Sequence, residues 1–317
     1  MLTVFMATRN GEGTLPSVLE AFTRLQSPNS GWKLVVVDNG STDRTREIVT
    51  AFQARLPLAY EFEPKPGKNA ALNTGLAYLE GDLAVFTDDD VFPREDWLVR
   101  LRKAADSQPF YTMFGGVVLP RWEVSPPEWL SWAPPGPVYT LTDPEISDGT
   151  TLPALVFGPN MAIRAHIFQS GIRFDTSIGP QGAAYAMGSE TELTERLGRQ
   201  GHKACHVSAA VVEHFIRKYQ MEKSWVFRRA VRYGRGHFRR ARAEDPSVYP
   251  NFLGLPLRLA VKLVKPSFRI AAASLRSDDR KVFSARWDFH FLLGYVIEAF
   301  FVGRDAQSNG ERLACSS

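Results

Sequence analysis

The stretch LAVFTDDDV, residues 83–91, contains an apolar run that leads directly into three consecutive carboxylates, Asp88, Asp89 and Asp90. The apolar run is typical of a buried strand in a parallel sheet, so the acids should lie at its carboxyl end, where open α/β sheets bind ligands. Adjacent carboxylates repel one another, and hard cations such as Mg²⁺ and Mn²⁺ prefer oxygen ligands. The stretch therefore indicates a cation site, against the alternative of an acidic surface turn with Asp90 near a helix N-terminus.

The segments on both sides of this stretch alternate between two hydrophobic patterns. Continuous apolar runs indicate buried strands, whereas apolar residues three or four positions apart indicate helices. This alternation predicts a doubly wound parallel sheet with right-handed crossovers. The expected strands are residues 2–8, 33–38, 58–62, 82–87, 109–119, 155–164 and 203–212, and the expected helices lie within 14–25, 43–56, 64–79, 93–101 and 190–200.

Three helix starts are predicted from the residues that precede or open them. Ser41 or Thr42 is the expected N-cap of the second helix, because a side-chain oxygen there accepts from a free backbone N–H. Pro93 is expected to open the helix that follows the acids. Ser189 and Glu192 stand three residues apart, which is the spacing of a capping box and places Ser189 at the N-cap of the helix over 190–200.

The composition is that of a globular protein with room for one large domain and an appendage. The chain has 317 residues, of which 44% are hydrophobic, so it can bury a full core. Its two cysteines, Cys205 and Cys315, provide neither a disulfide framework nor the spacing of a metal site. The first residues lack the basic region and apolar core of a signal peptide. No uninterrupted run of about 18 apolar residues predicts a membrane span.

The charge is distributed unevenly along the chain. Residues 217–286 contain 18 Lys and Arg against five Asp and Glu, and the rest of the chain is acidic. The basic residues of 224–243 and 252–275 are interleaved with Leu, Val and Phe rather than with polar side chains that read bases, so nucleic acid is not an expected partner. Basic amphipathic helices bind anionic membrane surfaces, and we expect such a surface as a partner. The alternative is a helical bundle that packs on the rest of the chain or on a second subunit.

Seven motifs follow one another along residues 1–240. They are VVVDNGSTDRT (35–45), PGKNAALNTGL (66–76), FTDDDV (86–91), GPNMAIR (158–164), GIRFD (171–175), GSETELTERL (188–197) and VEHF (212–215). No single motif is decisive, but in this order and spacing the sequence resembles the family 2 glycosyltransferases. The resemblance implies a GT-A fold, which is an α/β, Rossmann-like, doubly wound mixed sheet flanked by helices. We expect this catalytic domain over 1–222 and a basic, helical, membrane-associating region over 223–317.

The resemblance implies that the chain transfers a sugar from a nucleotide-diphosphate donor. Asp38 matches the acid that hydrogen-bonds the base, commonly uracil, and Thr8 and Arg9 at the end of the first strand are expected to line the same pocket. Glu12 matches an acid in the loop after the first strand. Lys68 lies in the stretch that contacts the nucleotide, and a cation at a helix N-terminus suits a phosphate. The alternatives are a strand-end cap for Asp38 and solvated side chains for Glu12 and Lys68.

Within the three acids the family pattern is Asp-x-Asp, and the resemblance assigns the metal there. Asp88 would contact the ribose or the metal, Asp90 the metal, and Asp89 the same nucleotide-sugar pocket less directly. His214 matches a downstream histidine that can complete the metal site, against the alternative of a structural histidine. The implied cofactor is Mn²⁺ or Mg²⁺, which would act as a Lewis acid for the departing diphosphate.

Transfer with inversion requires a general base for the acceptor hydroxyl. The resemblance assigns this role to Glu190, with Ser189 where the family often has a further acid. The helix dipole would lower the pKa of Glu190, so burial or acceptor binding must offset it. The alternative is that Glu190 only complements the dipole. Asp175 is expected to fix its loop and is the next candidate for the base.

Tryptophans could form the platform for the acceptor, since a flat apolar ring suits the C–H face of a sugar. Trp129 and Trp132 lie in a proline-rich segment and are the expected acceptor contacts, while Trp97 has the same chemistry but stands in a predicted helix. The alternative for each is a place in the core. The expected acceptor is a hydroxyl of a glycan or of a lipid-linked molecule.

The function expected from the sequence is metal-dependent inverting sugar transfer, with a UDP-sugar as the foremost donor, in the synthesis of cell-surface polysaccharide or glycolipid. The expected location is the cytoplasmic face of the cell membrane, as a peripheral protein, and a homo-oligomer is among the expected states. Two alternatives remain open. A nucleotidyltransferase shares an α/β scaffold and metal-binding acids, and a non-catalytic membrane-bound scaffold would retain nucleotide binding alone.

Overall fold

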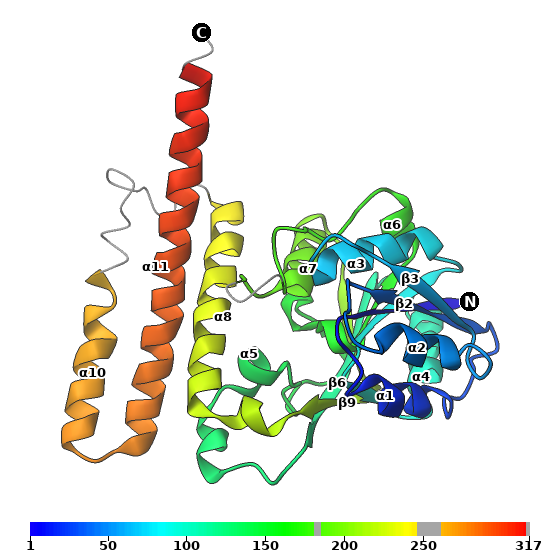
Figure 1. Ribbon diagram of the computed structural model, residues 1–317, viewed down its shortest axis with the longest axis horizontal. Coiled ribbons are helices and arrows are strands. Elements are labelled where there is room, and N and C mark those ends of the chain that lie inside the picture. Colours follow the sequence, from blue (N-terminus) through cyan, green and yellow to red (C-terminus); the bar gives the residue numbers. More distant parts are fainter. Residues whose placement is uncertain (181–184, 246–260, 315–317) are drawn as a thin grey trace. The chain divides into compact units, whose positions relative to one another are not determined.

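The computed structural model describes residues 1–180, 185–245 and 261–314, and they form two compact units (Figure 1). The first unit consists of Met1–Glu123, Tyr139–Gln181 and Ser189–Ile216. The second consists of Val124–Val138, Gly182–Gly188 and Arg217–Ser317. Two segments from within residues 1–222 group with the C-terminal helices, and the division into a catalytic domain over 1–222 and a membrane-associating region over 223–317 stays a prediction.

The first unit contains a mixed sheet with the strand order β3-β2-β1-β4-β8-β6-β9-β5, and β7 pairs with β9. Strands β1 to β4 are mutually parallel, whereas β8 is antiparallel to both β4 and β6. The purely parallel arrangement expected from the alternation is therefore wrong, and the mixed sheet implied by the resemblance is confirmed. The strands are β1 Leu2–Thr8, β2 Trp32–Asp38, β3 Leu58–Phe62, β4 Leu83–Asp88, β5 Val91–Pro93, β6 Met113–Trp122, β7 Gly149–Thr151, β8 Met161–Arg164 and β9 Ala204–Ile216.

Helices cover both faces of this sheet, which is why its central strands are apolar on both sides. On one face Phe5 and Phe86 stack with ring centroids 5.4 Å apart, under residues of α3, α6 and α7. On the other face Phe22 of α1 meets Trp97 of α4 edge-on at 6.1 Å. The helices of this unit are α1 Leu15–Phe22, α2 Thr45–Ala51, α3 Lys68–Gly75, α4 Trp97–Ser107, α6 His166–Gln169 and α7 Ser189–Arg199, with short 3₁₀ helices η1 Leu76–Tyr78, η3 Pro153–Leu155 and η4 Gly158–Asn160.

Trp97 belongs to this core and is not a candidate for sugar stacking. Its side chain is completely buried. The indole Nε1–H donates to Oδ1 of Asn160 at 2.8 Å, and the amide of Asn160 donates to the carbonyls of Val117 and Ala210 at 2.9 Å. This set satisfies the polar atom of a buried tryptophan and ties α4, through Asn160 of η4, to strands β6 and β9.

Two predicted helix starts are wrong. Helix α2 begins at Thr45 rather than after Ser41 or Thr42, because the carboxylate of Asp43 accepts from the backbone N–H and the hydroxyl of Thr45 at 3.0 and 2.5 Å. Pro93 does not open a helix but ends strand β5, where it faces Val212 of β9. Proline fits an edge strand of this kind because it has no N–H to donate.

The second unit is built mainly from helices, and α11 lies between α8 and α10 (Figure 1). Helices α8 and α11 approach closely at two glycines: a Cβ on Gly234 would lie 2.0 Å from the carbonyl oxygen of Phe291, and one on Gly294 would lie 2.0 Å from that of Val231. The elements are η2 Glu128–Trp132, α5 Pro135–Tyr139, η5 Lys218–Met221, α8 Lys223–Glu244, α10 Val264–Leu275 and α11 Asp279–Ala314. Among the helices that the structure describes, none is long and apolar enough to cross a membrane.

Candidate functional site

The carboxyl ends of β1, β2 and β4 bring the predicted donor-binding residues to one edge of the sheet. The strands are parallel and in register, with Thr8 opposite Asp38 and Ala7 opposite Asp88. The hydroxyl of Thr8 donates to Asp89 at 2.5 Å. The structure thus brings together Thr8, Asp38 and the acidic run, and Arg9 follows at the exposed end of β1.

Asp38 is buried and held in one orientation. One carboxylate oxygen accepts from the backbone N–H of Ser41 at 2.8 Å, and the other accepts from the hydroxyl of Tyr60 at 2.9 Å. Burial, together with Asp38, raises the pKa of Tyr60 to about 12, so the phenol stays protonated and donates. Sequence reasoning missed Tyr60, because it lies two positions before the end of β3 and only the pairing of β3 with β2 brings it to Asp38.

Glu12 lies in the loop after β1 and forms an ion pair with Arg44. Its carboxylate accepts from Nε and Nη2 of Arg44 at 2.8 and 2.5 Å, and its backbone N–H donates to Asp43 at 3.1 Å. The hydrogen bonds to Arg44 lower the pKa of Glu12. These contacts join the loops after β1 and β2, and a donor contact for Glu12 stays a prediction.

Lys68 is the first residue of α3 and joins two carboxylates that lie far apart in the sequence. Its ammonium lies 2.5 Å from Asp88 and 2.5 Å from Glu190. Burial opposes the charge, but the two carboxylates outweigh it and raise the pKa of Lys68. Burial also raises the pKa of Asp88, against the effect of Lys68. The helix start, the acidic run and the predicted base therefore form one cluster.

Glu190 is held within this cluster by its neighbours. The hydroxyl of Ser189 donates to its carboxylate at 2.6 Å. Burial alone would raise the pKa of Glu190, but the adjacent Lys68 outweighs burial and lowers the pKa to about 2. A Cβ on Gly158 would lie 2.5 Å from the Glu190 carboxylate, so the glycine provides the space for this side chain. Gly158 stands in the motif GPNMAIR, but the sequence did not reveal that this glycine makes room for the Glu190 carboxylate.

The predicted capping box at the start of α7 is wrong. Ser189 lies within the helix, and its hydroxyl is engaged with Glu190 rather than with a backbone N–H. Glu192 accepts instead from Arg196, one helical turn further on, at 2.7 Å. Because the hydroxyl of Ser189 donates to the Glu190 carboxylate, it helps to hold the predicted base and does not cap the helix.

Asn69 clamps the loop that precedes α7. Its amide donates to the carbonyls of Asp175 and Ile178 at 2.6 and 3.0 Å, and the Asp175 carboxylate accepts from the backbone N–H of Ser177 at 2.8 Å. Asp175 therefore fixes its loop, as expected. Asn69 itself is buried, and the residue at the N-cap of α3 is Gly67.

Asp90 and His214 face each other across paired strands. Their side chains approach to 3.5 Å between Oδ1 and Nε2, and Nδ1 of His214 hydrogen-bonds the carbonyl of Tyr139 at 2.7 Å. Burial lowers the pKa of His214, but Asp90 and the carbonyl of Tyr139 outweigh burial and raise the pKa, so Nε2 carries a proton toward Asp90 and a metal would bind there in place of that proton. Histidines that bind metals are commonly oriented in this way.

A divalent cation fits this donor set. Among the described residues, no three His, Cys, Asp or Glu side chains are grouped so as to hold a metal by themselves. Asp90 and His214 provide one carboxylate and one imidazole nitrogen, and Asp88 at the end of β4 has its carboxylate on Lys68. Mg²⁺ commonly takes one or two protein carboxylates and completes its shell with substrate phosphates and water, so an incomplete protein set agrees with a metal that binds together with a diphosphate.

Trp129 and Trp132 lie in the second unit and pack there against other side chains. Both rings contact Phe283, with centroids 5.5 and 6.3 Å apart, and the ammonium of Lys223 lies 5.5 Å from the ring of Trp129. The two rings are partly exposed. A role in binding an acceptor stays a prediction.

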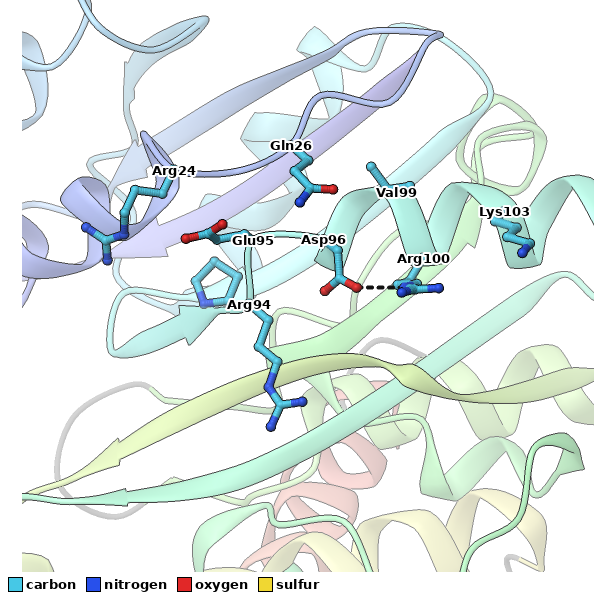
Figure 2. A pocket seen from close by; sticks show the side chains of 9 residues that line it. Arg24, Gln26, Arg94, Glu95, Asp96, Val99, Arg100 and Lys103 are labelled. Carbon is cyan, nitrogen blue, oxygen red and sulfur yellow. Dashed lines mark hydrogen bonds and ion pairs between the residues drawn. The ribbon is translucent and has the colours of Figure 1, made fainter.

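A surface hollow elsewhere in the first unit is lined by residues other than those of the cluster around Lys68 (Figure 2). Its charged side chains include Asp96 and Arg100, which form an ion pair at 2.7 Å. No residue predicted for the site lines this hollow, so it is separate from the cluster around Lys68. The lining residues are Arg24, Gln26, Pro93, Arg94, Glu95, Asp96, Val99, Arg100 and Lys103.

Comparison with known proteins agrees with this geometry. The family model described as "Glycosyl transferase family 2" matches residues 3–170. A glucosyl-dolichyl phosphate glucuronosyltransferase of Haloferax volcanii is 27% identical over 166 residues, which cover 51% of this chain and 50% of that protein. Glycosyltransferase AglE of the same organism is 34% identical over 102 residues, which cover 31% of this chain and 33% of AglE. The matches thus span half or less of these relatives' own length.

Two solved structures share the fold. A mannosyltransferase from Pyrobaculum calidifontis, in complex with GDP-Man and Mn²⁺, superposes with a TM-score of 0.63 at 21% identity, covering 94% of this chain and 86% of that one. TarS from S. aureus, residues 1–349 in complex with UDP-GlcNAc, has a TM-score of 0.53 at 15% identity, covering 98% and 92%. At 21% and 15% sequence identity, these similarities show a shared fold only.

Proposed function

The chain belongs to glycosyl transferase family 2, and we propose that it is a metal-dependent inverting enzyme that moves a sugar from a nucleotide-diphosphate sugar to an acceptor hydroxyl. The observation that carries this proposal is the cluster in which Lys68 lies 2.5 Å from both Asp88 and Glu190. Through Lys68, this cluster joins Asp88, at the strand ends proposed to bind the donor, to Glu190, the carboxylate proposed as the base. A UDP-sugar is the foremost donor, and a glycan or lipid-linked molecule is the acceptor.

The donor binds along the carboxyl ends of β1, β2 and β4. Asp38 accepts an N–H of the base, since a carboxylate oxygen that already accepts one hydrogen bond has room for a second. Tyr60 and Ser41 keep this carboxylate in place. Thr8, Arg9, Glu12 and Asp89 line the pocket around base and ribose. Two proteins of the same fold were solved in complex with nucleotide sugars, UDP-GlcNAc in one and GDP-Man in the other.

The diphosphate of the donor is neutralised by Lys68 at the N-terminus of α3, where the helix dipole also favours negative charge. Asp88, Asp90 and His214 would hold Mn²⁺ or Mg²⁺, which would supply Lewis-acid stabilisation of the leaving diphosphate. The Tyr139 carbonyl keeps the imidazole of His214 in the required orientation. These residues stabilise the charge that develops as the bond to the sugar breaks.

Glu190 acts as the base that takes the proton of the acceptor hydroxyl. In the structure Lys68 lowers the pKa of this carboxylate to about 2, after outweighing the effect of burial. A base works best when its pKa lies nearer the working pH. When Lys68 turns to the donor diphosphate, Glu190 loses its counter-charge while it remains buried, and its pKa rises. Binding of the donor thereby prepares the base.

The class of acceptor is supported by a relative. The glucuronosyltransferase of Haloferax volcanii is named for a glucosyl-dolichyl phosphate, which is a lipid-linked sugar. We propose an acceptor of this general kind, or a glycan, with Trp129 and Trp132 as contacts for its sugar rings. A role in the synthesis of cell-surface polysaccharide or glycolipid follows from such an acceptor.

The proposal is tested by incubating the full chain with UDP-, GDP- and dTDP-sugars and Mn²⁺, and by measuring release of free nucleotide diphosphate. Release of the diphosphate, with the sugar on water or on an added acceptor, is the expected result. Release of a sugar 1-phosphate, with the nucleoside monophosphate transferred to water or to an added acceptor, would indicate a nucleotidyltransferase. Binding of nucleotide without turnover of any donor, with and without candidate acceptors, would indicate a non-catalytic scaffold and contradict the proposal.

A further inference from the structure

Helix α10 has one buried side and one exposed apolar side. It packs against α11, and Pro266 and Ala273 are its buried residues. On the exposed side, Phe268 is 75% and Leu275 is 88% accessible to solvent, and Val264 is 54% accessible. Large apolar side chains of a soluble protein rarely form an exposed contiguous group unless that group binds something.

These three side chains lie on one face of the helix. They are separated by four and seven positions, which is the spacing of a single helical stripe. Val261 precedes Val264 by three positions and is 68% accessible. We call Val264, Phe268 and Leu275 the α10 apolar stripe. Its residues point away from the side that carries Pro266.

A basic stripe runs beside the α10 apolar stripe. Lys265 and Arg269 are four positions apart, Arg276 follows seven positions later, and all three are exposed. Arg269 also contacts Asp288 of α11 at 2.6 Å. The helix itself, VKPSFRIAAASL, contains no acidic residue. The exposed half of α10 is therefore apolar along one line and positively charged along the next.

The arginines of α8 differ from this pattern, because they are used within the unit. Arg235 and Arg239 both bind the buried carboxylate of Glu298, at 2.6 and 2.5 Å. The guanidinium of Arg232 lies 4.8 Å from the ring of Tyr185. Arg232, Arg235 and Arg239 of α8 thus contact other side chains within the unit, whereas the basic side chains of α10 are exposed to solvent.

We propose that α10 is a docking surface for an anionic lipid bilayer, with the α10 apolar stripe in the interfacial region and Lys265 and Arg276 against the lipid phosphates. A basic amphipathic helix lies in the plane of the interface and buries its apolar face there, and each Lys or Arg near an anionic surface strengthens binding. The charges disfavour a second copy of α10 as the occupant, because two basic stripes would repel. The inference stands apart from the proposed sugar transfer, since it uses no residue of the first unit.

The experiment is co-sedimentation of the full chain with vesicles of phosphatidylcholine containing phosphatidylglycerol, compared with phosphatidylcholine alone. Binding to the anionic vesicles is expected, and it should weaken as salt rises. Phe268→Ser should lower the partition coefficient by about tenfold or more, because a large apolar side chain no longer enters the interface. Lys265→Gln and Arg276→Gln should each lower it by about fivefold.

Matched controls are Phe110→Ser and Lys103→Gln in the first unit, where Phe110 is 84% accessible. They should leave vesicle binding unchanged. All variants should keep the thermal midpoint and the nucleotide release of the unaltered chain, since exposed side chains contribute little to stability. Equal binding to neutral vesicles would overturn the proposal. Failure to bind either kind of vesicle would also overturn the proposal. A dimer of the free chain that Phe268→Ser dissociates, together with no vesicle binding, would show that the stripe is covered by a second copy instead.

Discussion

The side chain of Glu190 is held from three directions, and each contact has a separate consequence. Lys68 supplies the opposite charge, Ser189 donates a hydrogen bond, and Gly158 leaves the space that a methyl group would fill. A carboxylate restrained in this way has one position for a proton acceptor and loses little freedom when an acceptor binds. The restraint also makes its chemistry testable by small substitutions.

Glu190→Gln should lower the turnover rate by about 10²–10⁴-fold, because a positioned base contributes about that factor and glutamine cannot take the proton. Donor binding, measured by calorimetry, should not weaken, since Asp38 and the acidic run carry that contact and Lys68 no longer has to leave the Glu190 carboxylate. Glu192→Gln is the control and should keep the rate, because it loses only the ion pair with Arg196. If Glu192→Gln slowed transfer and Glu190→Gln did not, the base would be Glu192.

Lys68→Met should move the acid limb of the pH–rate profile of kcat/KM to higher pH. The base must be deprotonated, and in the free enzyme Lys68 lowers the pKa of Glu190 to about 2, so activity should persist well into acid. Without the ammonium, burial raises that pKa, and activity is lost at a higher pH. The exposed Lys65→Met is the control. An acid limb at the same pH in Lys68→Met and in the unaltered chain would mean that another group titrates.

Residues of the site could be found from the sequence where a strand end exposes them. Asp38 and the acidic run follow apolar runs directly, and that position alone predicted the edge at which they lie. Tyr60 and Gly158 could not be found in this way. The importance of Tyr60 depends on the register between β2 and β3, and that of Gly158 depends on the distance between two backbones, neither of which is encoded by a local pattern.

At the scale of elements, the turn between β4 and β5 brings Asp90 to His214 of β9. Strand β5 pairs with β9, with Val91 opposite His214, and the backbone N–H of Phe215 donates to the carbonyl of Asp90 at 2.8 Å. The three-residue strand was not expected from the sequence, because Pro93 indicated a helix. A short edge strand is thus what fixes the distance between the two proposed metal ligands.

Asp90→Asn should raise the Mn²⁺ concentration needed for half-maximal activity by at least about tenfold, because a neutral amide replaces an anionic ligand. Binding of a nucleoside diphosphate should weaken in the same variant when it is measured with Mn²⁺, and chelator should abolish turnover of the unaltered chain. Asp96→Asn in the surface hollow is the control. Full turnover in excess chelator would show that the metal has no part in the reaction.

The contact between α8 and α11 depends on glycine. Gly234→Ala places a methyl group 2.0 Å from the carbonyl oxygen of Phe291, so the helices must separate. Overpacking of this kind costs about 1–3 kcal/mol, and it should appear as faster hydrogen exchange of amides in both helices. Gly13→Ala, whose Cβ would have no neighbour within 4 Å, is the control. Unchanged exchange in Gly234→Ala would mean that the two helices are not in this contact in solution.

At the scale of the whole molecule, the sequence predicted the mixed α/β unit and the helical C-terminal region, but not which inner segments join the helices. Residues 124–138 are rich in proline and tryptophan and lack a period, so no pattern assigned them to either unit. Their place depends on long-range contacts such as that of Trp129 with Phe283. In the same way, the charge count predicted a basic region without distinguishing the arginines that pair with Glu298 from the exposed stripe of α10.

A chain that ends at residue 222 should be poorly soluble. It would keep Trp129 and Trp132 but lose Phe227 and Phe283, with which their cluster is built. Size-exclusion chromatography should show aggregates, and Trp129→Ser together with Trp132→Ser should reduce them in the shortened chain. A monomeric shortened chain with the thermal midpoint of the full chain would contradict this prediction.

The division of the chain between the units also limits how such a protein can evolve. The polypeptide passes from one unit to the other after Glu123, returns at Tyr139, and repeats the excursion at Gly182–Gly188 before its final departure at Arg217. A single recombination point in the gene therefore cannot exchange the helical part for that of a relative, because two inner pieces would stay behind with their former host. Exchange of the helical part by recombination would therefore require several crossover points, or compensating substitutions in the two inner pieces.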